Sequence, residues 1–355
     1  MAEKVLMKGN EALAEAAISA GCRLFFGYPI TPQTEVAAYM SKRLPKVGGT
    51  YLQGESEVAS INMVLGACAT GVRAMTSTSS PGISLMAEGI SYIAGSDVPA
   101  LIINVQRGGP GLGGIQPSQG DYWQATRAAG HGDFHLIVFA PSTVQEMVDY
   151  VSLAFDLGEK YRMPSMVLSD GMLGQMMEPV VLPEAKEPSA EEKPWAACGH
   201  RNKRPHNIIN SLNTNPAELE KLVVDRFKRY DEVKKNEQRA EEYKMDDAEI
   251  VIVAYGSCSR VSRSAIDKAR KEGIKVGMIR PITLWPYPEE IIKKAVPKAK
   301  VFLSVEMSMG QMVEDVKLAS GCQRPVKFYG RTGGVIPTPN EVYDCIVKLS
   351  KGEDL

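Results

Sequence analysis

Over its first 180 residues the chain alternates short apolar runs with longer stretches of helical periodicity, and this alternation restricts the fold more than any other feature. The apolar runs have the length and β-branched content of strands, and the stretches between them are long enough for helices. Strands that alternate with helices form parallel sheets covered by helices on both faces. The predicted strands are Leu24–Tyr28, Thr50–Gln53, Arg73–Thr78, Pro99–Gln106, His135–Ala140 and Pro164–Ser169, and the predicted helices are Asn10–Ser19, Thr34–Arg43, Glu57–Thr70, Ile83–Ala94 and Thr143–Lys160.

The alternation stops near residue 180 and resumes at Ala248. Between them lie a charged run, Glu184–Lys193, flanked and interrupted by Pro183, Pro188 and Pro194, and then the stretch Pro216–Asp247. The prolines predict an exposed connector, and the stretch predicts a long amphipathic helix that acts as an interdomain brace.

We therefore expect an α/β protein with two doubly wound, mainly parallel-sheet domains. The expected divisions are 1–180 for the first domain, 181–247 for the linker and charged helix, and 248–355 for the second domain. The second domain is predicted to contain strands Glu249–Tyr255, Lys275–Arg280, Lys300–Val305 and Val326–Tyr329, with helices near Ser259–Glu272, Glu289–Val296, Gln311–Ala319 and Pro339–Leu349.

Charge and cysteine content exclude several classes of function. The chain has 355 residues and a formal net charge of −1, which argues against nucleic acid or an anionic membrane as the main partner. No apolar run is long enough to cross a bilayer, and the first residues lack the apolar core of a signal peptide. The six cysteines are scattered without a Cys-x-x-Cys pair, which is typical of reduced thiols in the cytoplasm and argues against a ferredoxin-type cluster in this chain alone.

An acidic residue, Glu57, opens the third predicted helix, and residues 58–70 that follow it carry no formal charge. An uncharged helix is typical of a protein interior, and burying an unpaired carboxylate is costly, so Glu57 is expected to have a partner. Gly66 on the same helix would let backbone or a cofactor pack closely. The alternative is that Glu57 only interacts with the helix dipole, as an acid in the first turn of a surface helix does.

The segment Tyr28–Pro32 follows the apolar run Leu24–Gly27, so a parallel strand would place Thr31 at the carboxyl edge of the sheet. Open α/β sheets bind their ligands at that edge. Pro29 and Pro32 restrict the backbone on both sides of Thr31. From chemistry alone, Thr31 is explained equally well as part of an ordinary strand-to-helix turn near a helix cap.

Arg107 follows the apolar run Ile102–Gln106 and is therefore expected at the same edge as Thr31. A guanidinium there can bind a carboxylate with two parallel hydrogen bonds, and the alternative is an ordinary surface arginine. The glycine-rich run Gly108–Gly114 is typical of a site loop. Its spacing matches a dinucleotide fingerprint, but Pro110 interrupts the turn and no clear helix follows, so we reject that interpretation.

Together these segments resemble the alpha-type, pyrimidine-domain subunit of the 2-oxoacid:ferredoxin oxidoreductases. The string Tyr28–Pro32 carries the clearest similarity, which extends over nearly the whole chain. Gln175–Pro179 and Glu306–Met307 look most like the 2-oxoisovalerate (3-methyl-2-oxobutanoate) type, with the 2-oxoglutarate type next. Further support comes from Asp170–Pro179, Arg280–Pro286 and Gly330–Gly334.

The resemblance implies a thiamine diphosphate pyrimidine-binding domain followed by a transketolase C-terminal-like domain. It implies coenzyme A-dependent oxidative decarboxylation of a 2-oxoacid to acyl-CoA, CO2 and reduced ferredoxin. In the family, the residue matching Glu57 hydrogen-bonds the pyrimidine ring and activates the cofactor, the one matching Thr31 contacts the substrate, and the one matching Arg107 binds its carboxylate. The expected catalytic residues are Glu57, Thr31 and Arg107, and the expected cofactor-binding residues are Glu57, Pro29, Ile30, Thr31 and Gly66.

One element that thiamine enzymes usually carry is missing from the sequence. The nearest string to their Mg²⁺-binding Gly-Asp-Gly is Ser169–Gly171, and Asn202 lies beyond the connector. We therefore expect no metal ligand in this chain, and thiamine diphosphate shared with a partner subunit that carries the diphosphate and Mg²⁺ site. The resemblance further implies a gamma subunit, a ferredoxin-like subunit with [4Fe-4S] clusters, ferredoxin as electron acceptor and coenzyme A as co-substrate.

Two other classes of function remain open at this point. The chain could be a non-catalytic scaffold with a vestigial half-site, although the joint presence of Thr31, Glu57 and Arg107 argues against that. It could instead be a self-sufficient thiamine enzyme, such as a decarboxylase or transketolase. The missing Mg²⁺-binding element counts against the latter.

Overall fold

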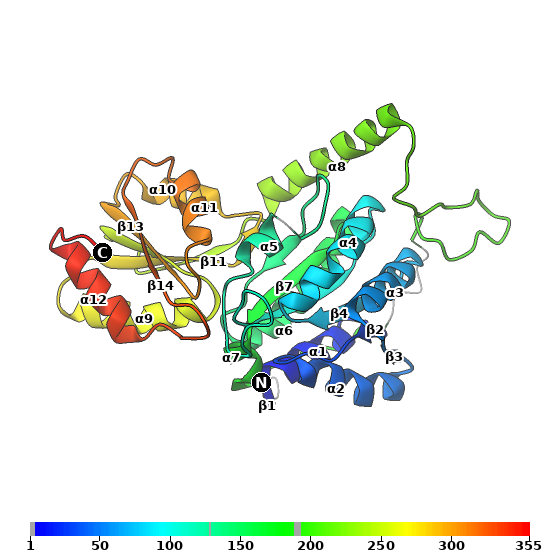
Figure 1. Ribbon diagram of the computed structural model, residues 1–355, viewed down its shortest axis with the longest axis horizontal. Helices are drawn as coiled ribbons and strands as arrows, with labels where there is room; N and C mark the ends of the chain where they lie inside the picture. The colour runs from blue at the N-terminus through cyan, green and yellow to red at the C-terminus, as the bar shows by residue number, and fades with distance from the viewer. Residues whose placement is uncertain (1–3, 128, 188–192) are drawn as a thin grey trace.

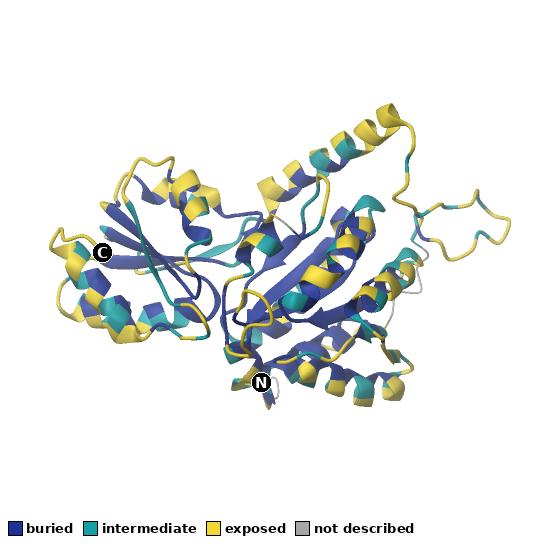
Figure 2. Ribbon diagram, viewed as in Figure 1, coloured by how far each residue is buried: buried dark blue, intermediate teal, exposed yellow. Residues whose placement is uncertain are grey.

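The fold is seen in a computed structural model of the chain (Figure 1), which describes residues 4–127, 129–187 and 193–355. Pro188 and the part of the predicted charged run at 188–192 lie outside the described residues. Two α/β units stand side by side, the first containing the N-terminus and the second the C-terminus (Figure 1). Figure 2 shows that the central strands of both sheets are buried.

The first unit is built on a seven-stranded sheet in the order β12-β6-β7-β5-β4-β2-β3, parallel except for β12 at one edge. Its central strands β4, β5 and β7 are buried along their whole length, including their polar residues. The strands are β2 (Leu24–Gly27), β3 (Thr50–Gln53), β4 (Ala74–Thr78), β5 (Leu101–Gln106), β6 (Ile137–Phe139), β7 (Ser165–Asp170) and β12 (Thr283–Trp285).

Helices cover this sheet on both faces. Helix α1 (Gly9–Ser19) packs against α2 (Thr34–Arg43) and α6 (Val144–Tyr161), and α3 (Glu57–Ala69) packs against α4 (Pro81–Gly95) (Figure 1). Right-handed crossovers place α2 and α6 on one face and α3 and α4 on the other, because the two pairs connect strands in opposite directions across the sheet. Smaller elements complete the unit: the 3₁₀ turn η1 (Leu44–Val47), α5 (Tyr122–Thr126), α7 (Gly171–Gln175) and the antiparallel pair β1 (Val5–Lys8) and β8 (Met177–Val180).

The second unit is built on a five-stranded sheet in the order β14-β13-β10-β11-β9, parallel except for β9 at one edge. Helices α9 and α12 pack together, as do α10 and α11. The elements are β9 (Ala240–Tyr243), β10 (Ile250–Val253), α9 (Gly256–Lys271), β11 (Val276–Pro281), α10 (Glu289–Ala295), β13 (Val301–Glu306), α11 (Met312–Ala319), β14 (Val326–Gly330) and α12 (Pro339–Ser350).

Two edge strands do not follow the domain limits expected from the sequence. Strand β9 precedes residue 248 but pairs with β11 of the second sheet, and β12 follows residue 248 but pairs with β6 of the first. Each sheet thus contains one short edge strand, β9 or β12, from outside the residue range expected for its domain. The pairing partners are far away in the sequence, so periodicity alone does not reveal them.

The connector runs over the surface and leads into α8 (Pro216–Asn236), whose outer half projects from the body (Figures 1 and 2). Only the second half of α8 is anchored: Arg226 donates hydrogen bonds to Asp97 and to the Gly95 carbonyl, and Tyr230 and Val233 are buried. The brace expected from the sequence is therefore limited to this half, because the residues of the first half are mostly exposed.

Several polar links join the two units, and three of them show how the units are held. Ser257 Oγ donates to Asp170 Oδ2 at 2.6 Å, and Gln119 Nε2 donates to the Tyr255 carbonyl at 2.9 Å. Arg280 donates to both carboxylate oxygens of Glu146, at 2.9 and 2.6 Å. Buried and bidentate contacts of this kind hold two bodies in one orientation better than exposed ion pairs do.

Among the described helices, none has both the length and the apolar character needed to cross a membrane.

Candidate active site

The three residues predicted to be catalytic all follow strands at the carboxyl edge of the first sheet or open the next helix there. Thr31 follows β2, Arg107 follows β5, and Glu57 is the first residue of α3. Helix α2 begins at Thr34 with Gln33 as its N-cap, so Thr31 lies in the strand-to-helix turn two residues before the cap and does not itself cap the helix. Thr31 is exposed, as a residue that meets a ligand must be.

Arg107 lies directly against the Thr31 segment. Its Nη1 donates to the Thr31 carbonyl at 3.0 Å and its Nη2 donates to the Leu112 carbonyl at 3.1 Å. The side chain is only 8% exposed, so the alternative of an ordinary surface arginine is wrong. Its Nε is buried without a hydrogen-bond partner among the described residues. The guanidinium is thus held in place with donors to spare, which fits a group that binds an anion.

A polar network that the sequence did not reveal lies behind Arg107. Ser80 Oγ accepts from the Arg107 amide at 3.0 Å and donates to Asp121 Oδ2 at 2.6 Å, and Asn104 Nδ2 donates to the same oxygen at 3.0 Å. Burial raises the pKa of Asp121, although these hydrogen bonds and Arg107 oppose the rise. The network ties the ends of β4 and β5 together. Its only signal in the sequence is the hydroxyl-rich run that follows β4.

Ser80, within that run, has a left-handed backbone with φ of 24°. Such a conformation in a non-glycine residue is costly and is typical of functional turns. Here it brings Ser80 N within 3.1 Å of Asn104 Oδ1 and leaves Gly82 at the start of α4.

Glu57 is buried, with 5% of its surface exposed, and its carboxylate makes no hydrogen bond with any residue that the structure describes. Gly82 leaves the space that it occupies: a Cβ at residue 82 would lie 2.9 Å from Glu57 Oε1 and 1.9 Å from Thr78 Oγ1. Its place at the N-terminus of α3 also agrees with the helix-dipole interpretation. The carboxylate has no partner among the described residues, so it also remains available to a ligand.

The expectation that α3 is an interior helix is wrong for this chain on its own. Its outer face is open to solvent, with Val58, Asn62, Met63 and Gly66 exposed. A Cβ at Gly66 would meet nothing within 4 Å. The absence of charge therefore marks a face that the chain leaves uncovered, because nothing in the described fold packs on that side.

The site fits the pyrimidine half of thiamine diphosphate but not its diphosphate half. Beside Glu57, the hydroxyls of Thr78 and Ser79 are buried without partners among the described residues. By contrast, the Asp170 carboxylate is already engaged: it accepts from Ser257 and from the amides of Met172 and Leu173, at 2.9 and 3.1 Å. Because these contacts use both of its oxygens, Asp170 is a structural cap rather than a candidate Mg²⁺ ligand.

Two hollows flank this sheet at opposite edges. The larger, of about 630 Å³, opens beside Thr31 at the carboxyl edge, and we call it the Thr31 pocket. It is lined by Thr31, Pro32, Glu35, Ile115, Gln116, Pro117, Gly171, Met172, Gln175, Met176 and Ile336.

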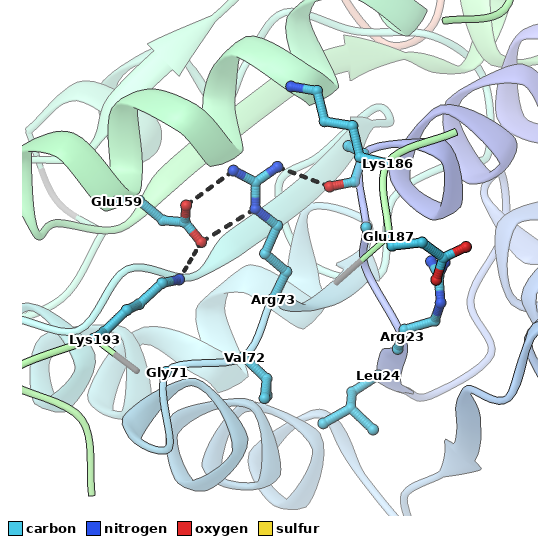
Figure 3. A pocket seen from close by; sticks show the side chains of 11 residues that line it. Arg23, Leu24, Gly71, Val72, Arg73, Glu159, Lys186, Glu187 and Lys193 are labelled. Carbon is cyan, nitrogen blue, oxygen red and sulfur yellow. Dashed lines mark hydrogen bonds and ion pairs between the residues drawn. The ribbon is translucent and has the colours of Figure 1, made fainter. Parts of the chain in front are cut away.

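The other hollow, of about 300 Å³, lies at the amino edge, where β2 and β4 begin (Figure 3). Its charges are satisfied within the wall: Arg73 pairs with Glu159 at 2.9 Å and Asp156 at 2.6 Å, and Lys193 pairs with Glu159. Since α/β sheets bind ligands at the carboxyl edge, we assign this amino-edge hollow to structure rather than to catalysis.

Residues 15–254 match the family described as "Pyruvate flavodoxin/ferredoxin oxidoreductase, thiamine diP-bdg", and residues 248–342 match "Pyruvate:ferredoxin oxidoreductase core domain II". Among curated proteins, the chain is 50% identical over 345 residues to ketoisovalerate oxidoreductase subunit VorB of Methanothermobacter thermautotrophicus, covering 97% of both chains. It is 39% identical over 368 residues to 2-oxoglutarate synthase subunit KorA of Methanocaldococcus jannaschii, covering 96% of this chain and 98% of that one.

Among solved structures, the chain resembles 2-oxoglutarate:ferredoxin oxidoreductase from Magnetococcus marinus, solved with 2-oxoglutarate, coenzyme A and succinyl-CoA bound. The TM-score is 0.85 at 29% identity, over 98% of this chain and 65% of that chain. A split-gene transketolase matches with a TM-score of 0.59 at 12% identity, which bears on the fold alone.

The chain therefore belongs to the pyruvate flavodoxin/ferredoxin oxidoreductase family, whose first domain binds thiamine diphosphate. Within it, the chain is the alpha subunit of a 2-oxoacid:ferredoxin oxidoreductase, with ketoisovalerate and 2-oxoglutarate subunits among its relatives. The family and the two-domain, mainly parallel α/β fold predicted from the sequence are confirmed. The roles assigned to Thr31, Glu57 and Arg107 stay predictions.

Proposed function

We propose that this subunit serves the oxidative decarboxylation of a branched-chain 2-oxoacid, 2-oxoisovalerate, with coenzyme A to an acyl-CoA, CO2 and reduced ferredoxin. The substrate choice rests on identity: 50% to a ketoisovalerate subunit against 39% to a 2-oxoglutarate subunit, both over nearly the full chain. The observation that carries the catalytic proposal is Glu57, a buried carboxylate without a partner at the carboxyl edge of the sheet.

Glu57 is proposed to hold the pyrimidine ring of thiamine diphosphate through a hydrogen bond to a ring nitrogen. When bound, thiamine diphosphate supplies a carbon nucleophile and an electron sink for decarboxylation. Gly82 leaves room for the Glu57 side chain, and the unpartnered hydroxyls of Thr78 and Ser79 lie nearby. Pro29, Ile30 and Gly66 are proposed as further contacts of the cofactor, with Gly66 on the exposed face of α3.

Arg107 and Thr31 are proposed to orient the oxoacid. The Arg107 guanidinium is buried and keeps spare donors, so it can bind the substrate carboxylate with charge-assisted hydrogen bonds. The Thr31 hydroxyl, exposed on the same segment, is proposed to donate to the oxo group as negative charge develops on it. Because Arg107 holds the Thr31 backbone, the two contacts would form together.

The rest of the cofactor site is proposed to come from a partner subunit that supplies the diphosphate and Mg²⁺ ligands. The exposed side chains Val58 and Met63 on α3, with Leu85 and Tyr92 on α4, form an apolar surface beside Glu57, which we call the α3–α4 face. Exposed apolar surfaces of this kind mark protein interfaces. A gamma subunit and a ferredoxin-like subunit with [4Fe-4S] clusters are proposed to pass electrons to ferredoxin.

The test is to isolate the native complex through a tag on this chain and to assay viologen reduction. Thiamine diphosphate, Mg²⁺ and coenzyme A are supplied, and 2-oxoisovalerate, 2-oxoglutarate, pyruvate and indolepyruvate are compared. We expect coenzyme A-dependent reduction, fastest with 2-oxoisovalerate. Faster reduction with 2-oxoglutarate would overturn the substrate, and purification without thiamine diphosphate or partner subunits would overturn the shared site.

A further inference from the structure

The Thr31 pocket and Glu57 belong to elements on different faces of the first sheet. Glu57 opens α3, on the face of the sheet covered by α3 and α4, whereas the pocket is lined by residues of α2 and α7 and of the loop after β5. Thr31 and Arg107 stand between the two regions, joined by the hydrogen bond to the Thr31 carbonyl. A substrate oriented by these two residues, with its reacting carbon toward the Glu57 side, would direct its side chain into the Thr31 pocket.

Much of the wall of this pocket is apolar. Met172 and Met176 come from the segment after β7, and Ile115 comes from the loop after β5. Ile336 of the second unit closes the far side, so the walls come from both units. Methionine side chains adapt to irregular apolar ligands, and a volume of about 630 Å³ is that of an ordinary small-molecule site.

Among the lining residues that the structure describes, Glu35 is the one that carries a charge. Asn10 Nδ2 donates to its Oε2 at 2.9 Å and Gln175 Nε2 donates to its Oε1 at 2.8 Å. Partial burial favours the neutral acid, but the hydrogen bonds from Gln175, from its own backbone amide and from Asn10, together with Lys8, lower the pKa of Glu35 overall. Glu35 therefore keeps its negative charge at neutral pH.

The cation beside Glu35 and Gln175 is Lys8, whose Nζ lies 3.5 Å from Gln175 Oε1. It sits behind the Gln175 amide and is not among the residues that line the pocket. A second carboxylate on a substrate would thus meet Glu35 before it met a cation. Like charges at such short range are strongly unfavourable in a partly buried site.

We propose that the Thr31 pocket receives the side chain of the 2-oxoacid and that Glu35, with the wall formed by Met172 and Met176, makes it select apolar side chains over acidic ones. This inference rests on the proposed function and adds the residues that set its substrate class. Glu35 acts as an electrostatic filter against dicarboxylates such as 2-oxoglutarate. The methionines supply the apolar contact.

The test uses the intact complex, purified through a tag on this chain, with two variants and two matched controls. Glu35→Gln removes the charge while keeping a side chain that can still accept a hydrogen bond, and its control Glu15→Gln removes a carboxylate that pairs with Arg43 instead. Met176→Ala shortens the wall, and its control Met177→Ala changes the adjacent, exposed methionine. For each, kcat/KM is measured for 2-oxoisovalerate and 2-oxoglutarate, with KM for coenzyme A.

In Glu35→Gln we expect the ratio of kcat/KM for 2-oxoglutarate to that for 2-oxoisovalerate to rise at least about tenfold. In Met176→Ala we expect kcat/KM for 2-oxoisovalerate to fall about tenfold, the usual effect of losing apolar contact in a specificity pocket. The controls should match the wild type in both.

Unchanged oxoacid kinetics in both variants, or a rise in KM for coenzyme A without a change in the oxoacid ratio, overturns the inference while leaving the proposed function intact. Failure of the wild-type complex to oxidise any 2-oxoacid overturns both.

Discussion

Arg107 Nη1 donates a hydrogen bond to the backbone carbonyl of Thr31 across 76 residues of sequence, at 3.0 Å. The contact joins the loop after β5 to the loop after β2, two strands separated in the sheet by β4. Arg107 therefore has two tasks that are usually separate: it fixes the segment that presents Thr31, and it keeps donors for a ligand. Any change at Arg107 should therefore affect both the binding of the ligand and the position of the Thr31 hydroxyl.

Replacing Arg107 with lysine should raise KM for the oxoacid by roughly ten- to a hundredfold, because a single ammonium cannot hold the Thr31 and Leu112 carbonyls and a carboxylate at once. Steady-state kinetics of the complex would measure this. Arg43→Lys, which changes an arginine paired with Glu15 on α1, is the control and should leave KM as in the wild type. An unchanged KM in Arg107→Lys would show that Arg107 does not bind the substrate.

Glu57→Gln should lower the turnover rate at least about a hundredfold while the complex still assembles, because the amide cannot exchange a proton with the cofactor ring. The matched control is Glu55→Gln, which removes an exposed carboxylate two residues earlier, just before α3. Turnover is measured by viologen reduction and assembly by size-exclusion chromatography. Near-normal turnover of Glu57→Gln would remove Glu57 from the mechanism.

Leu85→Glu should prevent the diphosphate-binding subunit from co-purifying with this chain. Leu85 is 54% exposed on the α3–α4 face, where a charge would have to be buried on assembly. Leu318→Glu is the control, because Leu318 is exposed on α11 of the second unit, away from that face. Subunit composition after tag purification gives the answer. Equal recovery of the partner with both variants would contradict the proposed interface.

Ser257→Ala should lower the free energy of unfolding by about 1–3 kcal/mol, because it leaves the buried Asp170 carboxylate with one hydrogen bond fewer between the two units. Ser259→Ala tests the specificity of this effect, since its hydroxyl donates only to the nearby Gly256 carbonyl. Denaturant unfolding followed by circular dichroism would compare the two. Equal losses would mean that the interdomain contact adds nothing beyond an ordinary buried hydroxyl.

The Glu146–Arg280 contact should make stability depend on pH in the acid range. Burial favours the neutral form of Glu146, but hydrogen bonds from Arg280 and Ser142 outweigh it, and the pKa of Glu146 is lowered. A carboxyl whose pKa is lower in the folded than in the unfolded state stabilises the fold above its unfolded pKa, and this contribution is lost as pH falls below about 4. The melting temperature should therefore fall across that range in the wild type and change less in Glu146→Gln. Parallel pH profiles would contradict the assignment.

Most elements of the first unit could be predicted because their signals are local. The run Leu24–Gly27 and the charge-free strand β5 are apolar in sequence because both are packed into a covered sheet. Strands β9 and β12 escaped prediction for the opposite reason. Each is short, and each pairs with a strand that is not its neighbour in the sequence.

The candidate site also has some features that the sequence predicted and others that it did not. The positions of Thr31 and Arg107 at one edge followed from the strands that precede them, but the hydrogen bond between them did not. Glu57 stood out in the sequence because its helix is otherwise uncharged, yet the same feature led to the wrong expectation of an interior helix. The uncharged sequence of α3 shows that its outer face lacks charge, but it does not show what covers that face.

By itself, the sequence determined the α/β class, the two sheets and which strand ends carry Thr31, Arg107 and Glu57, because hydrophobic periodicity and turn residues act over a few neighbouring positions. Only the tertiary structure decided what these residues touch: the buried, unpartnered state of Glu57, the Ser80–Asp121 network, the engagement of Asp170 by Ser257, and the pocket beside Thr31. These features depend on contacts between segments tens to hundreds of residues apart. Such contacts are set by how whole elements pack, and no local pattern encodes them.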